Sequence, residues 1–160
     1  MNIMIEKAAM SDVANIQKLN EKLFRLEVSS GFDPDLDIGW SLSEEGGKEI
    51  EERISSENES CGFIAKDGEK IIGYLIGRIL EEETGRAQSR YADLEHMFID
   101  DKYRGKGIGR QLIDAFKLWS KSQGLKLVKV NVSYKNADAI EFYKKNGLAA
   151  VDITMVGEIE

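Results

Sequence analysis

The feature that most constrains the fold is a glycine-rich turn between a strand-like and a helix-like segment. Residues 91–99 are mostly apolar and predict a strand, whereas residues 107–123 carry apolar side chains at helical spacing. Three glycines two residues apart, Gly105, Gly107 and Gly109, join the two segments, with one basic residue among them and one on each side. Glycine lets backbone approach a ligand closely, and the first amides of a helix bind anions. The turn therefore predicts a cradle for a pyrophosphate.

The glycine spacing argues against two common nucleotide-binding loops. The pattern G-x-G-x-G does not match the phosphate loop G-x-x-x-x-G-K-[ST]. It also differs from the G-x-G-x-x-G of dinucleotide-binding folds, and it lies late in the chain instead of after the first strand. The loop alone leaves one alternative open, a tight strand-to-helix turn with incidental basic residues.

The hydrophobic pattern along the whole chain predicts an α/β domain with the element order βααβββαβαβ. Ser11 and Ser43 are expected to cap the first two helices, and Asp67-Gly68 marks a hairpin turn. Antiparallel hairpins followed by a βαβ crossover predict a mixed sheet with helices on both faces. No repeat or linker divides residues 1–160, so we expect a single domain. The expected strands cover residues 3–5, 61–66, 70–80, 91–99, 126–132 and 148–159; the expected helices cover 11–28, a segment after Ser43, 107–123 and 136–146.

Composition bears on location and cofactors. With one cysteine, Cys61, and one histidine, His96, the chain has no pair for a disulfide and no Cys/His cluster for a metal. Glu6 and Lys7 precede any signal-like apolar run, and no uncharged stretch approaches the ~20 residues that cross a bilayer. We expect a cytoplasmic protein without a metal or a membrane partner.

The net charge of −7 hides two oppositely charged segments. Residues 31–60 contain ten acidic and two basic residues, whereas residues 101–130 contain eight basic and two acidic ones. A polyanionic ligand at the second segment and a cationic one near the first would suit this distribution, although two solvated faces would also explain it. Nucleic acid is not an expected partner, because the chain has no overall basic excess.

Two motifs together resemble the GCN5-related N-acetyltransferase (GNAT) family. Arg104–Gly109 is similar to the family's pyrophosphate signature R/Q-x-x-G-x-G/A, and Asn136–Leu148 is similar to its second motif N-x-x-A-i-x-f-Y-x-k-x-G-f. The two motifs stand in the family's order with one expected strand between them. Asp101 replaces a frequent proline, and Leu148 replaces the usual aromatic residue. Over the first 60 residues the resemblance consists of element order alone.

The resemblance implies an acetyl-CoA cosubstrate bound where two parallel strands splay apart. The pantetheine arm would pair, as an added strand does, with the strand expected at residues 91–99. The loop amides would hold the diphosphate. Asn136 would reach the pantetheine or cap the last helix. The implied cofactor-binding residues are Met97, Phe98, Ile99, Arg104, Gly105, Lys106, Gly107, Ile108, Gly109, Arg110, Asn136 and Tyr143.

The resemblance also implies direct acetyl transfer to an amine, without an acetyl-enzyme. Tyr143 matches the tyrosine that protonates the leaving thiolate, and Glu95 matches the catalytic glutamate of diamine and polyamine acetyltransferases. Strand alternation predicts Asp93, Glu95 and Met97 on one face and His96 on the other, so Asp93 or an ordered water remains an alternative base.

The acceptor is expected to be a small cationic amine. Its pocket would form from the first two helices, their loop and the segment from Glu81 to Tyr91, which are acidic. Two alternatives remain: a protein or peptide acceptor, and a non-catalytic domain that senses acyl-CoA. Homodimers are common in the family, but no residue of this sequence points to an interface.

Overall fold

The structure is a computed structural model that describes residues 1–82 and 85–159. It contains one mixed sheet with the strand order β1-β2-β3-β4-β5. Neighbouring strands from β1 to β4 run antiparallel, and β4 and β5 run parallel, which confirms the predicted mixed α/β class. The strands are β1 Ile3–Lys7, β2 Ser60–Asp67, β3 Lys70–Glu81, β4 Arg90–Ile99 and β5 Val128–Val130; the α-helices are α1 Val13–Ser29, α2 Glu44–Ser55, α3 Ile108–Ser122 and α4 Ala137–Lys145; 3-10 turns cover Met10–Asp12, Ile38–Leu42 and Asp101–Tyr103.

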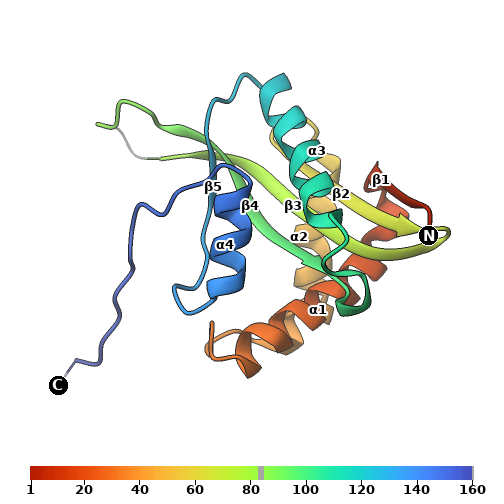
Figure 1. Cartoon of the computed structure of the whole chain (residues 1–160), viewed down its shortest axis with the longest axis horizontal. Coiled ribbons are helices and arrows are strands. Elements are labelled where there is room, and N and C mark those ends of the chain that lie inside the picture. The colour runs from red at the N-terminus through yellow and green to blue at the C-terminus, as the bar shows by residue number, and fades with distance from the viewer. Residues whose placement is uncertain (83–84, 160) are drawn as a thin grey trace.

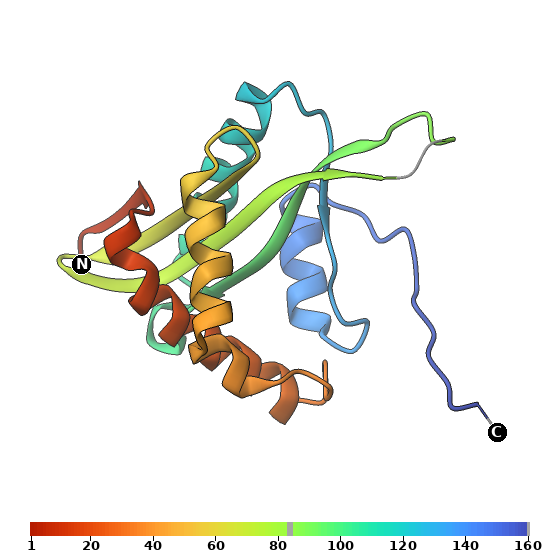
Figure 2. The same cartoon turned by 180° about the vertical axis from the view of Figure 1, so that it is seen from behind.

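Helices cover both faces of the sheet (Figures 1 and 2). On one face α3 buries Leu112 and Phe116 against the sheet, next to Leu75 of β3. On the other face α1 buries Ile16 against Tyr74 and other residues of the sheet. Adjacent residues of β3 thus enter opposite cores, as strand alternation requires. No described helix is long and apolar enough to cross a membrane.

One of the two expected serine caps is confirmed. The Ser43 hydroxyl accepts a hydrogen bond from the amide of Gly46 at 3.1 Å, at the start of α2. Ser11 instead lies inside a 3-10 turn, and α1 begins only at Val13. The carboxylate of Asp12 accepts from the amide of Ala9 at 2.8 Å and closes that turn. The Asp12 side chain therefore closes the 3-10 turn and makes no capping bond to the first amides of α1.

The expected last strand is absent. Residues 148–159 contain no strand pairing, and they extend away from α4 and the rest of the molecule (Figure 1). The expected strand 126–132 is also shorter and reduces to Val128–Val130. Both differences arise because a segment becomes a strand only where it forms hydrogen bonds with a neighbouring strand. β5 pairs with β4 over three residues only.

The short β4–β5 ladder creates the expected splay. Ala92, Asp93 and Leu94 pair with β5, whereas the second half of β4 continues alongside β3 alone. The two parallel strands therefore share a short ladder at one end and separate at the other. The V-shaped split that the family resemblance implied is confirmed.

Candidate functional site

The separated half of β4 presents a free backbone edge. Met97, Phe98 and Ile99 pair with Leu75, Tyr74 and Gly73 of β3, and in the described chain no strand pairs with their opposite side. An extended ligand with amide groups can pair with such an edge as an added strand does. The structure thus places three predicted cofactor-binding residues on a backbone that can receive a pantetheine arm.

The glycine-rich loop follows directly, at the end of β4. Gly105 and Gly107 adopt left-handed backbone conformations, with φ of +74° and +77°, and a Cβ on either would meet nothing within 4 Å. Gly107 is the N-cap of α3 and makes no side-chain capping bond, so the first amides of the helix are available to an anion. The side chain of Ile108 is buried, so only its backbone can take part.

Gly109 has a different role from the other two glycines. A Cβ at this position would lie 2.9 Å from Cζ of Phe142, which belongs to α4. Absence of a side chain therefore lets α3 and α4 pack closely, and α4 in turn carries Tyr143. The sequence alone assigned all three glycines to ligand approach; the structure divides them between the loop and the packing.

Three basic side chains surround the loop. The guanidinium of Arg104 lies over the ring of Phe98 at 5.0 Å, donates to the Ile99 carbonyl at 3.0 Å and pairs with Asp101. Lys106 lies over the Tyr103 ring at 5.3 Å. Arg110, on the first turn of α3, is exposed and makes only a long 3.9 Å pair with Asp114. All three side chains remain exposed enough to meet a polyanion.

Asn136 is the N-cap of α4. Its side-chain oxygen accepts from the amide of Ala139 at 3.1 Å, which confirms the capping role that the sequence offered as one of two possibilities. The capping bond uses the oxygen and leaves the amide group of the side chain for a second partner.

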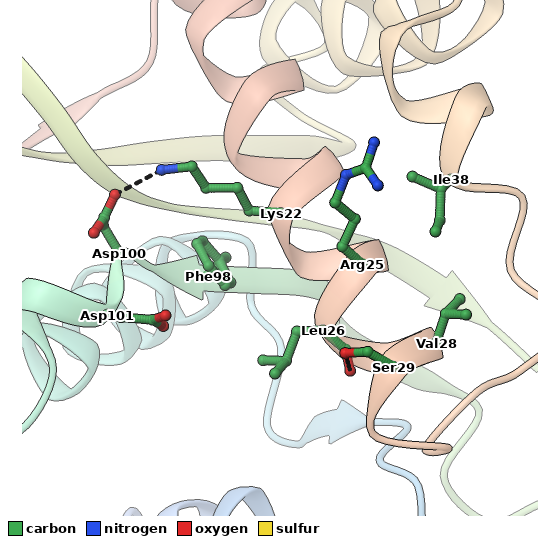
Figure 3. Close-up of a pocket in the computed structure, with 9 residues that line it drawn as sticks. All are labelled: Lys22, Arg25, Leu26, Val28, Ser29, Ile38, Phe98, Asp100 and Asp101. Carbon is green, nitrogen blue, oxygen red and sulfur yellow. Dashed lines mark hydrogen bonds and ion pairs between the residues drawn. The ribbon is translucent and has the colours of Figure 1, made fainter.

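A groove of about 590 Å³ lies between α1 and the end of β4 (Figure 3). The figure shows the ion pair that crosses it, from Lys22 Nζ to Asp100 Oδ2 at 2.8 Å. Its wall carries both charge signs, with Lys22 and Arg25 from α1 and Asp100 and Asp101 after β4. Of the segment 81–91 that was expected to contribute, residues 83 and 84 lie outside the described chain. The lining residues are Lys22, Arg25, Leu26, Val28, Ser29, Ile38, Phe98, Asp100 and Asp101.

Tyr143 lies on α4 beside the α3-side core. Its ring packs edge-on against Phe142, with centroids 5.2 Å apart. Burial raises the pKa of the Tyr143 phenol to about 12, and the negative charge of Glu27 on α1 acts in the same direction. The phenol is therefore fully protonated at neutral pH and can act as a proton donor.

Glu95 sits in an ion-pair cluster. Its carboxylate accepts two bonds from Arg53 of α2, at 2.6 Å and 3.0 Å, and lies 3.2 Å from Nε of Arg78. The same Arg78 Nε donates to Asp93 at 3.2 Å. Burial raises the pKa of Asp93, against the opposing effect of Arg78. The two carboxylates proposed as alternative bases thus share one arginine.

A β-bulge at Glu95 overturns the predicted alternation along β4. Ile76 pairs with His96 and the next residue, Gly77, pairs with Leu94, so Glu95 is an extra residue without a partner on β3. Past the bulge the faces are exchanged. The prediction that Met97 shares the face of Glu95 and that His96 faces away is therefore wrong: Met97 packs against the α3-side core, and His96 turns toward α1.

His96 belongs to a buried polar group that sequence reasoning missed. Its Nδ1 lies 3.1 Å from the hydroxyl of Tyr74, which also accepts a bond from Asn20 Nδ2 at 2.9 Å. Burial lowers the pKa of His96 to about 4; Glu95 opposes this shift and Arg53 reinforces it. The ring is therefore neutral at pH 7. Asn20 and Tyr74 are 54 positions apart, so no local pattern could have linked them.

Comparison with known proteins decides the family. The sequence profile of the acetyltransferase (GNAT) family matches residues 21–148. The chain belongs to this family. An uncharacterized N-acetyltransferase of Methanocaldococcus jannaschii is 36% identical over 62% of the chain, and a streptothricin acetyltransferase of Escherichia coli is 29% identical over 73%. The matched stretches span 44% and 67% of those two relatives.

The GNAT fold is also found by structural similarity. An aminoglycoside N-acetyltransferase solved in complex with CoA superposes with a TM-score of 0.76 at 18% identity, over 99% of this chain and 95% of that one. At this identity the likeness concerns the fold. It shows that the split sheet of the GNAT family is the architecture of the present chain.

Proposed function

We propose that the protein transfers an acetyl group from acetyl-CoA directly to an amine. One observation carries this proposal: the free backbone edge of β4 leads straight into the glycine loop and the uncapped start of α3. CoA has a matching arrangement, because its pantetheine arm is joined to a pyrophosphate just as the β4 edge is joined to the loop. The basic side chains of Arg104, Lys106 and Arg110 supply charge for the phosphates.

Tyr143 is the proposed proton donor. The amine nitrogen forms a bond to the thioester carbonyl carbon, the carbon–sulfur bond breaks, and CoA leaves as a thiolate that must gain a proton. The raised pKa of Tyr143 keeps its phenol protonated for that step.

Glu95 is the proposed acceptor of the amine proton, with Asp93 as the alternative. An alkylammonium is not a nucleophile, so a base must remove a proton before or during attack. Arg78 contacts both carboxylates, so a proton gained by one leaves the other fully paired with that arginine. Arg53 holds Glu95 in a fixed orientation from α2.

The proposed acceptor is a small amine. The groove beside β4 has the volume of a typical small-molecule site. The similar proteins described above act, by their names, on streptothricin and on aminoglycosides, and aminoglycosides carry several amino groups. A cationic acceptor would also suit the acidic residues exposed along α2. We further propose that the protein is cytoplasmic and forms a homodimer.

Binding of acyl-CoA without catalysis is the second candidate. The three contacts of Glu95 with Arg53 and Arg78 favour it, because a carboxylate held by two guanidinium groups accepts a proton only by weakening those bonds. A protein that binds acetyl-CoA but turns over no amine would support this candidate.

The decisive experiment measures release of CoA thiol from acetyl-CoA with polyamines, amino acids, aminoglycosides and peptides. Tyr143→Phe and Glu95→Gln should each lower kcat by about 10²- to 10⁴-fold, as expected for loss of an acid or base. Asp93→Asn reports on the alternative base. The controls Tyr134→Phe and Glu69→Gln change exposed residues outside the site and should leave kcat unchanged.

Binding of acetyl-CoA is tested separately by calorimetry on Gly107→Glu. The matched control is Gly124→Glu at the other end of α3, because Gly124 has a similar φ of +72° and equal free space. Both variants carry the same backbone strain and the same new charge. Only Gly107→Glu should lose acetyl-CoA binding; equal affinity of the two variants would refute the cradle.

A further inference from the structure

The acidic groups that line the groove between α1 and the end of β4 are already paired. Lys22 pairs with Asp100 across the groove at 2.8 Å, and this contact lowers the pKa of the Asp100 carboxyl group. Asp101 pairs at 3.0 Å with Arg104, whose guanidinium also lies over the ring of Phe98. Both aspartates of the wall therefore have a basic partner before any ligand enters.

Arg25 differs from Lys22, because its acidic partner lies outside the groove. Its Nε pairs with Glu21, one turn earlier on α1, and Glu21 does not line the groove. The Arg25 side chain is still 64% exposed, so its other N–H groups can meet a ligand. In Figure 3 Lys22 points to Asp100, whereas Arg25 extends toward the side of Ile38. The groove thus offers a guanidinium to an anionic group.

Most of the remaining wall is apolar. The side chains come from three elements: Leu26 and Val28 from α1, Ile38 from the 3-10 turn that follows, and Phe98 from β4. An apolar body on the ligand would gain free energy by burial against them. A polyamine would instead bring positive charge next to the two bases of α1 and has no anionic group to offer. The groove therefore suits a ligand with an apolar body and an anionic end.

We propose that the acceptor is a small amine that also carries an apolar body and a carboxylate, which is the chemistry of an apolar amino acid. Its carboxylate binds the Arg25 guanidinium, and its amino group faces the free edge of β4, beside which the pantetheine arm is proposed to lie. The reaction joins the amino nitrogen to the acetyl carbon and releases CoA thiol and one proton. This inference rests on the proposed function and narrows its acceptor from small amines in general to this class.

The test compares L-leucine with L-leucinamide, which has the same amino group and side chain but no carboxylate. Release of CoA thiol gives kcat/KM for each amine. The two amines differ in intrinsic basicity, so the informative quantity is the ratio of their kcat/KM values in different variants. Arg25→Gln should lower the leucine-to-leucinamide ratio about tenfold, through loss of a charge-assisted bond to leucine alone. Arg25→Lys keeps the charge without the forked geometry and should fall between the two.

The matched control is Lys7→Gln. It also removes an ion-paired cation, one that is 53% exposed on β1 and does not line the groove, so the ratio should stay at the wild-type value. An equal ratio in the wild type and Arg25→Gln would overturn the proposal, as would a higher kcat/KM for spermidine than for leucine. A raised KM for acetyl-CoA in Arg25→Gln, with the ratio unchanged, would show that the groove holds the cosubstrate and would also refute it.

Calorimetry separates this inference from a failure of the proposed function. Leucine is titrated into the protein saturated with CoA, which has no acetyl group to transfer. Leucine binding that weakens in Arg25→Gln, without turnover of any amine, would refute acetyl transfer but support this ligand class for the groove. Turnover of other amines, without leucine binding that depends on Arg25, would support the proposed function and refute the inference.

Discussion

His96 is the only histidine of the chain, and it provides a test of the buried polar group beside the bulge. In the unfolded chain it binds a proton with a pKa near 6.5. In the folded protein, burial lowers this pKa to about 4. Between these values unfolding takes up a proton, so acidification favours the unfolded state. The contribution of His96 to stability is thus present above pH 6.5 and lost as the pH falls toward 4.

The size of this effect follows from the two pKa values. Between pH 7.5 and pH 5.0 the free energy of unfolding should fall by about 2 kcal/mol, and the loss should reach about 3 kcal/mol near pH 4. Glu27 and Asp93 act in the opposite direction at lower pH, because burial raises the pKa of each. Comparison with a variant that lacks only the histidine, and keeps both carboxyl groups, therefore isolates the effect of the histidine.

The assay is urea unfolding at pH 7.5, 6.5, 5.5 and 5.0 for the wild type and His96→Asn. The asparagine oxygen can still accept the Tyr74 hydroxyl, but the side chain does not titrate. The variant should lose most of the pH dependence, and NMR should place the His96 pKa well below 6. Equal losses of stability in both proteins would refute the assignment of the effect to this ring.

Three further predictions concern packing, capping and the proton donor. Gly77→Ala would drive a Cβ into the ring of Phe116 and to 3.0 Å from the Asp93 carbonyl, so it should destabilise by about 1–3 kcal/mol in thermal unfolding; an unchanged melting temperature would contradict the contact. Ser43→Ala should cost about 1 kcal/mol in urea unfolding through loss of the cap of α2, while Ser43→Asp should retain it. The raised pKa of Tyr143 predicts that kcat shows no loss centred at pH 10, and such a loss would indicate an unperturbed phenol.

Local sequence signals predicted much of the fold and the outline of the site. The hairpin at Asp67-Gly68, the cap at Ser43 and the left-handed glycines of the loop depend on a few consecutive residues. Such features follow from backbone sterics and short-range hydrogen bonds, which the neighbouring residues determine. The order of the elements and the family motifs also placed Met97–Ile99 at the start of the proposed acetyl-CoA site.

Tertiary structure alone decided the features that depend on partners distant in sequence. The bulge at Glu95 exists because β3 and β4 shift register, and this shift moves His96 to the face of Tyr74. Arg53 reaches Glu95 across 42 positions, and neither residue carries a local sign of that pair. The tail shows the same division: its alternating pattern marks residues 148–159 as a potential strand, but a strand forms only where another backbone supplies the hydrogen bonds.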